Sequence, residues 1–356
     1  MLLKYLINMD RKTKIIATVG PSLASKEKIH SAIDTGVNVF RINFSHGTLE
    51  EHKQYIDWIR SSKKKVAIMQ DIQGPKIRTG RVKEKTVLQK SKDIKLTNKQ
   101  EESSDEIIFI NYENLCEDVN VDDRVFIDDG QIILKITEKH KDKLGALILI
   151  GGELRDNQGV AFPDSKLSVS AITKQDIEHL KFGTEKDVDF VAVSFVRNSD
   201  DIQAVREIVP KDVKIIAKIE LKTALENIEE ILQVSDGVMV ARGDLGVQLP
   251  IEQVPFVQKQ ILDAANSKGK ISITATEMLQ SMKSSYRPTR AEVTDITNAI
   301  LEGSDAVMLS AETSIGDHPN RVIEVMSNIC KEVDSRNDTS SLLPKKIPKK
   351  IHTRPH

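Results

Sequence analysis

The sequence contains little of what marks several large classes of protein. Its 356 residues include only two cysteines, Cys116 and Cys330, so neither a disulfide framework nor a Cys-x-x-Cys metal site is indicated. This cysteine usage predicts a cytoplasmic location. No apolar run approaches the ~20 residues that a membrane helix needs. The apolar start, residues 1–7, is too short for a signal peptide, so a role in a membrane is not expected.

An excess of charge of one sign is missing, as are the common nucleotide-binding loops. The formal net charge is −1, which argues against binding to nucleic acid. No Gly-x-x-x-x-Gly-Lys-Ser/Thr loop occurs, and no Gly-x-Gly-x-x-Gly follows a strand, so P-loop and dinucleotide-binding folds are disfavoured. The strand ends also offer no Ser–His or Cys–His pair for a nucleophilic mechanism.

What the sequence does contain is a repeated alternation of apolar strands and amphipathic helices. The expected strands are Lys14–Val19, Val37–Phe44, Val66–Ile72, Phe190–Val196, Val213–Ile219, Gly237–Ala241, Ile271–Ala275 and Ala306–Leu309. Continuous apolar strands that alternate with helices indicate parallel strands buried on both faces. Eight such units predict an α/β protein with a (β/α)8 TIM barrel.

Helix ends can also be read. Thr289 followed by Glu292 has the spacing of a capping box, and Gly303 stands where a glycine commonly ends a helix. A last helix is expected over Pro319–Val333. It would follow the eighth strand and complete the barrel.

One long interruption separates the third strand from the fourth. Residues 81–160 alternate short β-like runs with Gly, Asp and Asn turns, and the expected strands are Asp93–Leu96, Glu106–Ile110, Arg124–Ile127, Ile132–Ile136 and Ala146–Ile150. This pattern predicts a small all-β domain inserted into a barrel loop. We assign residues 10–78 and 163–336 to the barrel and 79–162 to the insert. A basic disordered tail is expected over residues 337–356.

Polar residues gather where most of the barrel strands end. They are Arg41, Asn43 and Ser45, then Asp71, Lys218 and Glu220, residues 242–244, Thr276 and Ser310. Each has an ordinary structural interpretation on its own: Lys218 and Glu220 as an ion pair, residues 242–244 as a turn with a helix cap, and the hydroxyls as partners for backbone groups. Barrel enzymes build their sites at this end of the strands, so charged clusters on four strands indicate a shared charged ligand or ion.

The mixture of charges at these strand ends indicates phosphoryl transfer. The carboxylates are Asp71, Glu220 and Asp244, and the cations are Arg41, Arg78 and Lys218. Carboxylates beside a phosphate-binding set of cations suit Mg²⁺, which accepts one or two protein carboxylates together with substrate oxygens. Phosphoryl transfer needs positioning and charge neutralisation rather than a covalent nucleophile.

Nine short motifs give the chain a strong resemblance to the pyruvate kinase family. In order they are KIIATVGPS (14–22), RINFSHG (41–47), DIQGPKIRTG (71–80), DDG (128–130), KIE (218–220), ARGDLG (241–246), ATEML (275–279), RPTRAEV (287–293) and VMLSAET (307–313). They cover nearly the whole chain in family order. The resemblance implies a barrel with an inserted β domain and transfer of a phosphoryl group from phosphoenolpyruvate to ADP, giving pyruvate and ATP (EC 2.7.1.40).

The resemblance also implies roles for the phosphate and metal contacts. Glu220 and Asp244 would hold Mg²⁺, which Mn²⁺ could replace. Lys218 would stabilise the transferring phosphoryl group, and Arg41 would hold the same phosphate. The inserted domain would close as a lid that excludes water.

Further roles concern the rest of the substrates. Thr276 would lie near the enolate and help deliver the proton that makes pyruvate. The substrate carboxylate would bind at a helix N-terminus formed by Ala241, Gly243 and Asp244. The expected nucleotide contacts are Arg78, Asn43 and His46.

Lys76 places the chain with the family members that resemble K⁺-independent enzymes. Many members have Glu at this position and are similar to enzymes that hold K⁺ with residues matching Asn43, Ser45, Asp71 and the carbonyl of Ile72. The Lys76 ammonium can supply the positive charge of a bound K⁺, so K⁺ is not expected to be required. The alternative is a solvated loop lysine.

The chain also departs from the family pattern in several places. Gln158 stands near the position of a basic residue of the inserted domain, Glu277 replaces a common Gln, and Ala311 replaces a common Gly. The family usually continues into a C-terminal effector domain, which is absent here, so a short form without sugar-phosphate allostery is expected. Barrel contacts around Arg290 could still form a homo-oligomer.

Two other functions stay open from the residues. One is a lyase or decarboxylase barrel that binds phosphoenolpyruvate or pyruvate, which nucleotide dependence would distinguish. The other is a catalytically impaired scaffold protein that uses the basic tail. The presence of both Lys218 and Glu220 argues against the second function.

Overall fold

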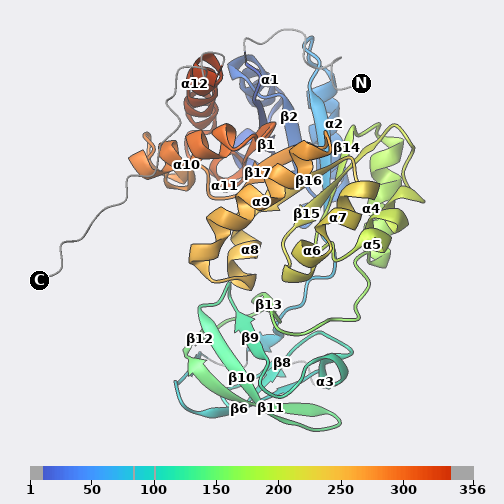
Figure 1. Ribbon diagram of the computed structural model, residues 1–356, viewed down its shortest axis with the longest axis vertical. Coiled ribbons are helices and arrows are strands. Elements are labelled where there is room, and N and C mark those ends of the chain that lie inside the picture. Colours follow the sequence, from blue (N-terminus) through green and yellow to red (C-terminus); the bar gives the residue numbers. More distant parts are fainter. Residues whose placement is uncertain (1–10, 83–84, 100–101, 338–356) are drawn as a thin grey trace, which may run out of the picture.

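The barrel predicted from the eight apolar segments is confirmed. The computed structural model describes residues 11–82, 85–99 and 102–337 of the chain, so the predicted tail after its first residue lies outside the described part. Eight parallel strands close in the order β1-β18-β17-β16-β15-β14-β3-β2 (Figure 1). Their bounds are β1 Lys14–Thr18, β2 Val39–Asn43, β3 Ala67–Ile72, β14 Phe190–Val193, β15 Lys214–Ile219, β16 Gly237–Ala241, β17 Ile271–Ala275 and β18 Ala306–Leu309.

Two predicted barrel strands were too long by three residues each, and three others by one residue. The segment expected as Val37–Phe44 forms a strand only over β2, and the one expected as Phe190–Val196 stops at Val193. Phe195 has φ +55°, a left-handed conformation that cannot continue a strand. The chain therefore turns sharply just after β14, at the end of the barrel where the polar residues lie.

Most helices lie around the outside of the barrel, and α8 lies at its lower end, toward the insert (Figure 1). The helices are α1 Lys26–Thr35, α2 Leu49–Arg60, α4 Lys174–Glu185, α5 Ser199–Arg206, α6 Lys222–Glu226, α7 Ile228–Val234, α8 Arg242–Gln248, α9 Val254–Ser267, α10 Arg290–Leu301, α11 Ala311–Ser314 and α12 Pro319–Asn337. Short 3₁₀ helices lie at η2 Pro21–Leu23, η3 Ile251–Gln253 and η4 Gln280–Lys283. None of the helices in the described ranges combines the length and hydrophobicity that a membrane crossing requires.

The helix-end signals correspond to real caps. Thr289 and Glu292 form the predicted capping box at the start of α10, each side chain pairing with the other's backbone N–H. Gly303, just after this helix, has φ +101°. The last helix, α12, starts at Pro319 as predicted and runs four residues beyond the predicted end at Val333.

The strands between β3 and β14 form a separate β structure below the barrel in Figure 1. A six-stranded sheet has the order β13-β9-β10-β11-β6-β8, and two further pairs are β12-β5 and β4-β7. The bounds are β4 Arg81–Val82, β5 Thr86–Leu88, β6 Asp93–Thr97, β7 Glu102–Ser103, β8 Ile107–Phe109, α3 Leu115–Asp118, β9 Arg124–Ile127, β10 Ile132–Lys139, β11 Lys143–Ile150, β12 Gly152–Leu154 and β13 Val160–Ala161. We call residues 79–162 the insert.

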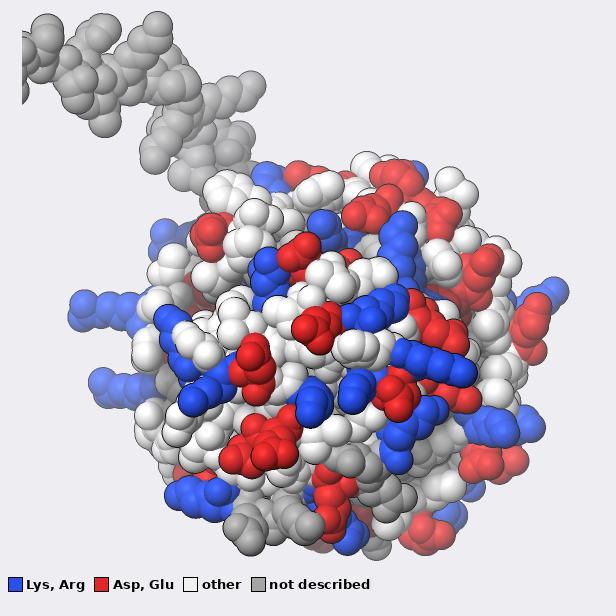
Figure 2. Space-filling model, turned by 90° about the horizontal axis from the view of Figure 1, so that it is seen from below, with Lys and Arg blue, Asp and Glu red and all other residues white. Residues whose placement is uncertain are grey.

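Each part of the molecule has its own apolar core. Inside the barrel, Ile16, Met69, Ile216 and Met239 pack together, and a larger cluster fills the space between strands and helices. The insert has a separate buried cluster that includes Leu134. Its outer face, seen from below in Figure 2, carries positive and negative side chains interspersed with one another.

Candidate active site

The polar residues predicted at the strand ends meet at one end of the barrel because of the strand register. Thr18 of β1 is paired with Arg41 of β2, and Asn43 with Asp71 of β3. On the other side, Val193 of β14 is paired with Ile72. Parallel strands in a barrel end on the same side, so these side chains come from neighbouring strands to a common place.

Asp71 lies at the centre of this group. Its side chain is 1% exposed, and its Oδ2 accepts a hydrogen bond of 2.6 Å from Nε of Arg41. Its Oδ1 lies 3.4 Å from Nζ of Lys218. Burial opposes ionisation of Asp71, but Lys218 and Arg41 hold the pKa of its carboxyl below the usual value. One carboxylate thus holds two cations that could face a phosphate.

The ammonium group of Lys218 contacts three neighbouring side chains. Nζ lies 2.8 Å from Oε1 of Glu220 and donates a 2.7 Å hydrogen bond to Oγ of Ser194, in addition to the Asp71 contact. Burial would lower the pKa of Lys218, but Asp71 and Glu220 raise it above its ordinary value. The ammonium is therefore charged at neutral pH.

Glu220 is the second buried carboxylate of the site. Its side chain is 1% exposed, and Oε2 accepts a hydrogen bond of 2.8 Å from N of Phe195. Burial raises the pKa of Glu220, Lys218 lowers it, and the negative charge of Asp244 adds to the rise. Asp244 itself is exposed on the first turn of α8.

Thr276 sits in a strained turn beside α8. It has φ +67° and Glu277 has φ +55°, conformations that cost about 1–3 kcal/mol each for residues other than glycine. Thr276 Oγ1 accepts a hydrogen bond from N of Gly243 at 2.8 Å and donates one to O of Ala275. The buried Arg242 donates to O of Thr276 and is anchored by both carboxylate oxygens of Asp295 at 2.7 Å. Arg242, predicted as a turn residue, is therefore buried and holds the loop at Thr276 in place.

Lys76 and Arg78 reach the site from the segment that leads into the insert. Burial, Arg78 and Lys218 lower the pKa of Lys76, while Asp71 and Asp244 partly offset the drop. Lys76 is half-buried, so it interacts with the charged group rather than lying free in solvent. Arg78 donates from Nη1 to O of Asn157 in the insert at 2.7 Å.

The segment before Lys76 is held in place by α4. Oδ1 of the buried Asp176 accepts hydrogen bonds from N of Gln73 and of Gly74, while its Oδ2 takes part in the capping box at Thr173. Gly74 has φ +66°, and a Cβ there would lie 3.1 Å from Cδ2 of Phe195. Only glycine fits this position without strain.

The side chains of Asn43 and Asp71 and the carbonyl of Ile72, which were predicted to hold a monovalent cation, already have partners within the protein. Oδ1 of Asn43 accepts a hydrogen bond from N of Ser45 at 3.1 Å, and O of Ile72 accepts one from Oγ of Ser194 at 2.8 Å. Asp71 is taken up by the two cations described above. His46, after them, is exposed, and burial together with Lys76, Arg78 and Arg41 lowers its pKa.

Two buried hydroxyls of the site were missed by the sequence reasoning. Thr18 Oγ1 accepts a hydrogen bond from Nη1 of Arg41 and donates one to O of Leu309. Ser194 contacts Lys218 as described. Both stand at the ends of predicted strands, but a hydroxyl at such a place is too common to single out from sequence.

The comparisons with known proteins agree with the motifs. The family model described as pyruvate kinase, barrel domain, matches residues 10–323. The chain belongs to the pyruvate kinase family. It is 45% identical over 334 residues to a pyruvate kinase of Thermotoga maritima, covering 92% of this chain and 72% of that protein. It is 43% identical over 343 residues to pyruvate kinases of Staphylococcus epidermidis and Staphylococcus aureus, covering 94% of this chain and 59% of each of those proteins.

Pyruvate kinases generally use Mg²⁺ and often K⁺. The carboxylates of Glu220 and Asp244 are close enough for the charge of Asp244 to affect Glu220, and among the described residues no three His, Cys, Asp or Glu side chains form a ready-made metal cluster. Mg²⁺ accepts one or two protein carboxylates and completes its coordination with substrate and water oxygens. The residues present therefore fit this ion.

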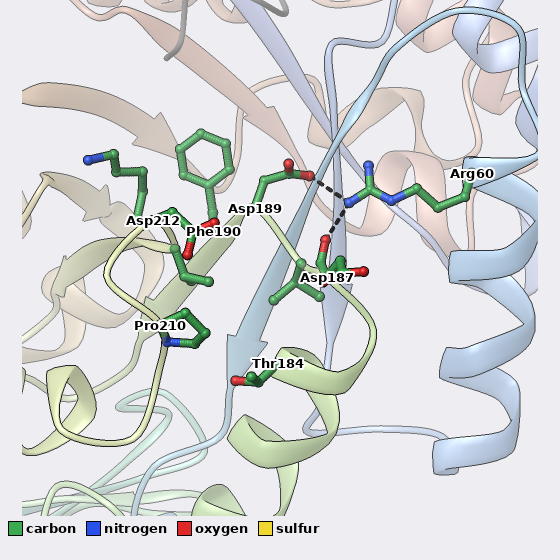
Figure 3. A pocket seen from close by; sticks show the side chains of 10 residues that line it. Arg60, Thr184, Asp187, Asp189, Phe190, Pro210 and Asp212 are labelled. Carbon is green, nitrogen blue, oxygen red and sulfur yellow. Dashed lines mark hydrogen bonds and ion pairs between the residues drawn. The ribbon is translucent and has the colours of Figure 1, made fainter.

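A pocket of about 330 Å³ lies away from this site (Figure 3). It is lined by residues at or just before the starts of β14 and β15, among them Asp189, Phe190 and Val213. Arg60 in this pocket is already bound to O of Asp187 and to Asp189. In a barrel of this kind the end before the strands serves stability, so this pocket is not taken as the candidate active site.

Proposed function

We propose that this chain transfers the phosphoryl group of phosphoenolpyruvate to ADP, giving pyruvate and ATP as the last step of glycolysis. The observation that carries the proposal is the pair of cations Arg41 and Lys218 at the carboxyl end of the barrel, both in contact with the buried carboxylate of Asp71, with the buried Glu220 as a second partner of Lys218. A phosphate between them would meet two positive charges whose positions are already fixed. Such preorganised charge is the largest part of catalysis in phosphoryl transfer.

In the proposed mechanism the phosphorus–oxygen bond to the enol oxygen breaks as a bond forms to an oxygen of the ADP β-phosphate. Arg41 binds the phosphate in the ground state, and Lys218 stabilises the charge on the transferring group. The enolate left behind takes up a proton at its terminal carbon to give pyruvate. Thr276, whose hydroxyl lies between Gly243 N and Ala275 O, is the group we assign to help deliver this proton.

The other contacts follow the chemistry of the site. N–H groups at Ala241, Gly243 and Asp244, where α8 begins, would receive the substrate carboxylate. Arg78, with Asn43 and His46, would contact the nucleotide. Glu220 and Asp244 would hold Mg²⁺ or Mn²⁺, and bound Mg²⁺ supplies neutralisation of the phosphate charge. The insert would close over the site and exclude water.

K⁺ would not be required in this mechanism. Lys76 brings a positive charge to Asp71 and Asp244, and the carbonyl of Ile72 is used by Ser194. We place the reaction in the cytoplasm, where the free thiols Cys116 and Cys330 would stay reduced. We also propose a homo-oligomer formed through contacts between barrels, around Arg290 at the start of α10.

The test is pyruvate formation by the purified protein from phosphoenolpyruvate and ADP with Mg²⁺, in buffers with and without K⁺. Activity in both buffers is expected. Lys218→Met should lower kcat by about 10²–10³-fold, because a cation aimed at the developing charge is lost. The matched control is Lys211→Met, an exposed lysine away from the site, which should keep full activity. A folded wild-type protein that forms no pyruvate in either buffer would exclude the proposal.

A further inference from the structure

The turn just after β14 contacts both Lys218 and Glu220, although none of the family motifs quoted above includes this turn. Its two residues, Ser194 and Phe195, form what we call the 194–195 corner. The Ser194 hydroxyl accepts the 2.7 Å hydrogen bond from Nζ of Lys218, and N of Phe195 donates at 2.8 Å to Oε2 of Glu220. One corner of the backbone therefore holds the ammonium and the carboxylate at the same time.

The direction of the Ser194 hydroxyl proton is fixed by its surroundings. Oγ donates to O of Ile72 at 2.8 Å and lies 3.3 Å from Oδ1 of Asp71. A hydroxyl has one proton to donate and lone pairs to accept with. With the proton directed at the carbonyl, a lone pair is left to receive the ammonium of Lys218.

The corner itself has little freedom to move. Ser194 is 4% exposed, and Phe195 is held at φ +55°, which turns its N–H toward Glu220. Gly74 packs against both residues, since a Cβ there would lie 3.3 Å from O of Ser194 and 3.1 Å from the Phe195 ring. A left-handed non-glycine residue persists only where its surroundings hold it in place.

The three contacts of Lys218 are unequal. Two are short, to Ser194 at 2.7 Å and Glu220 at 2.8 Å, and the third, to Asp71, is longer at 3.4 Å. A phosphate that enters would compete first with Asp71 for Nζ of Lys218, because that contact is the longest and therefore the weakest. The hydrogen bond to Ser194 would then hold the ammonium in position, while the N–H that had pointed to Asp71 binds the phosphate.

We propose that Ser194 is a positioning residue of the reaction, whose hydroxyl fixes the Lys218 ammonium against the barrel wall so that it meets the transferring phosphoryl group. The inference rests on the proposed function and extends it to a residue that does not itself touch substrate. Loss of the hydroxyl leaves the ammonium charged but free to move toward Glu220 or Asp71. Small errors of position at a reacting centre lower the rate more than they lower binding.

The experiment compares Ser194→Ala with a matched pair, Ser194→Thr and Ser194→Val. Thr and Val have nearly the same shape and differ in the hydroxyl, so any cost of the added methyl group is shared. In steady-state assays with Mg²⁺ we expect Ser194→Ala and Ser194→Val to lose about 10-fold or more in kcat, the scale of one hydrogen bond to a charged group. The KM for phosphoenolpyruvate should change little, since Arg41 still holds the phosphate. Ser194→Thr should recover most of kcat.

Several outcomes would overturn the role of Ser194. A kcat of Ser194→Ala equal to wild type would do so, and so would equal kcat values for the Thr and Val variants. A fall in melting temperature without a fall in kcat would assign Ser194 to stability alone. Should Ser194→Ala not fold, the Thr and Val pair decides.

A crystal structure of the Ser194→Ala variant separates this inference from the proposed function. We expect Nζ of Lys218 to shift from its wild-type position, toward Glu220 or toward Asp71. An ammonium that stays there contradicts the positioning role, whatever the activity. If the wild-type protein forms no pyruvate, the proposed function fails, and the position of Nζ still decides whether Ser194 aims Lys218.

Discussion

The charges at the centre of the site are balanced residue by residue. Two buried carboxylates, Asp71 and Glu220, face two cations, Arg41 and Lys218. Burial of unpaired charge is costly, and removal of one partner from a buried pair typically costs about 3–5 kcal/mol. Loss of one of these four residues would therefore leave an unpaired buried charge. A phosphate that enters together with its metal cation brings charges of both signs and disturbs this balance less.

Lys76 gives the sharpest test at the residue scale. Lys76→Glu replaces a cation beside Asp71 and Asp244 with an anion, so the site should then need K⁺ to restore its charge. We expect activation by K⁺ of roughly 10-fold or more, the scale of one well-placed charge. Pyruvate formation is measured in K⁺ and in tetramethylammonium buffers. Lys65→Glu, an exposed lysine, makes the same charge change and should stay insensitive to K⁺. If the activity of Lys76→Glu did not depend on K⁺, Lys76 would not be the replacement for a bound K⁺.

At the scale of elements, α2 and α4 enclose two histidines beneath β2. His52 of α2 is 4% exposed and lies tilted against Phe44, with ring centroids 4.2 Å apart, and the ring centroid of His179 of α4 lies 5.1 Å from that of the same phenylalanine. Burial and the neighbouring His179 lower the pKa of His52 from 6.5 to about 4. The packing of these two helices on the barrel therefore favours the neutral ring.

This packing predicts that acid destabilises the barrel through His52. The unfolded chain binds a proton on this ring below about pH 6.5 and the folded chain only near pH 4, so stability is lost as the pH falls between these values. The loss should amount to roughly 1–3 kcal/mol, allowing for partial access of solvent to the ring. Urea unfolding at pH 7 and pH 5 measures it. His52→Leu should show a smaller loss than wild type.

The control for that experiment is His140→Gln, which changes an exposed histidine in the hairpin between β10 and β11. It should leave the pH dependence of the unfolding free energy unchanged. Identical pH dependence in His52→Leu and wild type would mean that other groups govern the acid response.

The elements could be predicted from sequence because their signals are local. Apolar strands buried on both faces, the capping box at Thr289 and the glycine after α10 depend on residues a few positions apart. The charged members of the site could be predicted because Lys218 and Glu220 at strand ends are unusual. Ser194 could not, since its meaning depends on Lys218 of the next strand. The left-handed Thr276 could not either, because Arg242 and Asp295 hold it from elsewhere in the fold.

At the scale of the whole molecule, apolar side chains are exposed on one side of the barrel. Ile251 of η3 is 71% exposed and Phe256 of α9 is 79% exposed. The two residues are five positions apart in the sequence, and exposed apolar side chains that form a patch often mark a contact with another protein. We propose that η3 and α9 contribute to the contacts between barrels, in addition to the region around Arg290.

Phe256→Glu tests that association. A charge placed in an apolar contact is costly to bury, so the variant should have a lower mass than wild type in light scattering at equal concentration. Val87→Glu makes the same kind of change at an exposed apolar position of the insert and should leave the mass unchanged. A wild-type protein that is monomeric at all concentrations, or a Phe256→Glu variant with unchanged mass, would contradict contacts at this surface.

The seam of the barrel has a consequence for how the chain is made. β1 is paired with β18, and Asp334 accepts a hydrogen bond from Thr13, 321 residues earlier. The ribosome releases the first three strands long before their last partner exists, whereas the insert emerges as one uninterrupted stretch with a core of its own. Long-range pairing is slow because a large loop must close first. The insert can therefore fold on the ribosome, whereas the barrel cannot close until β18 has been made and its strand edges stay open until then.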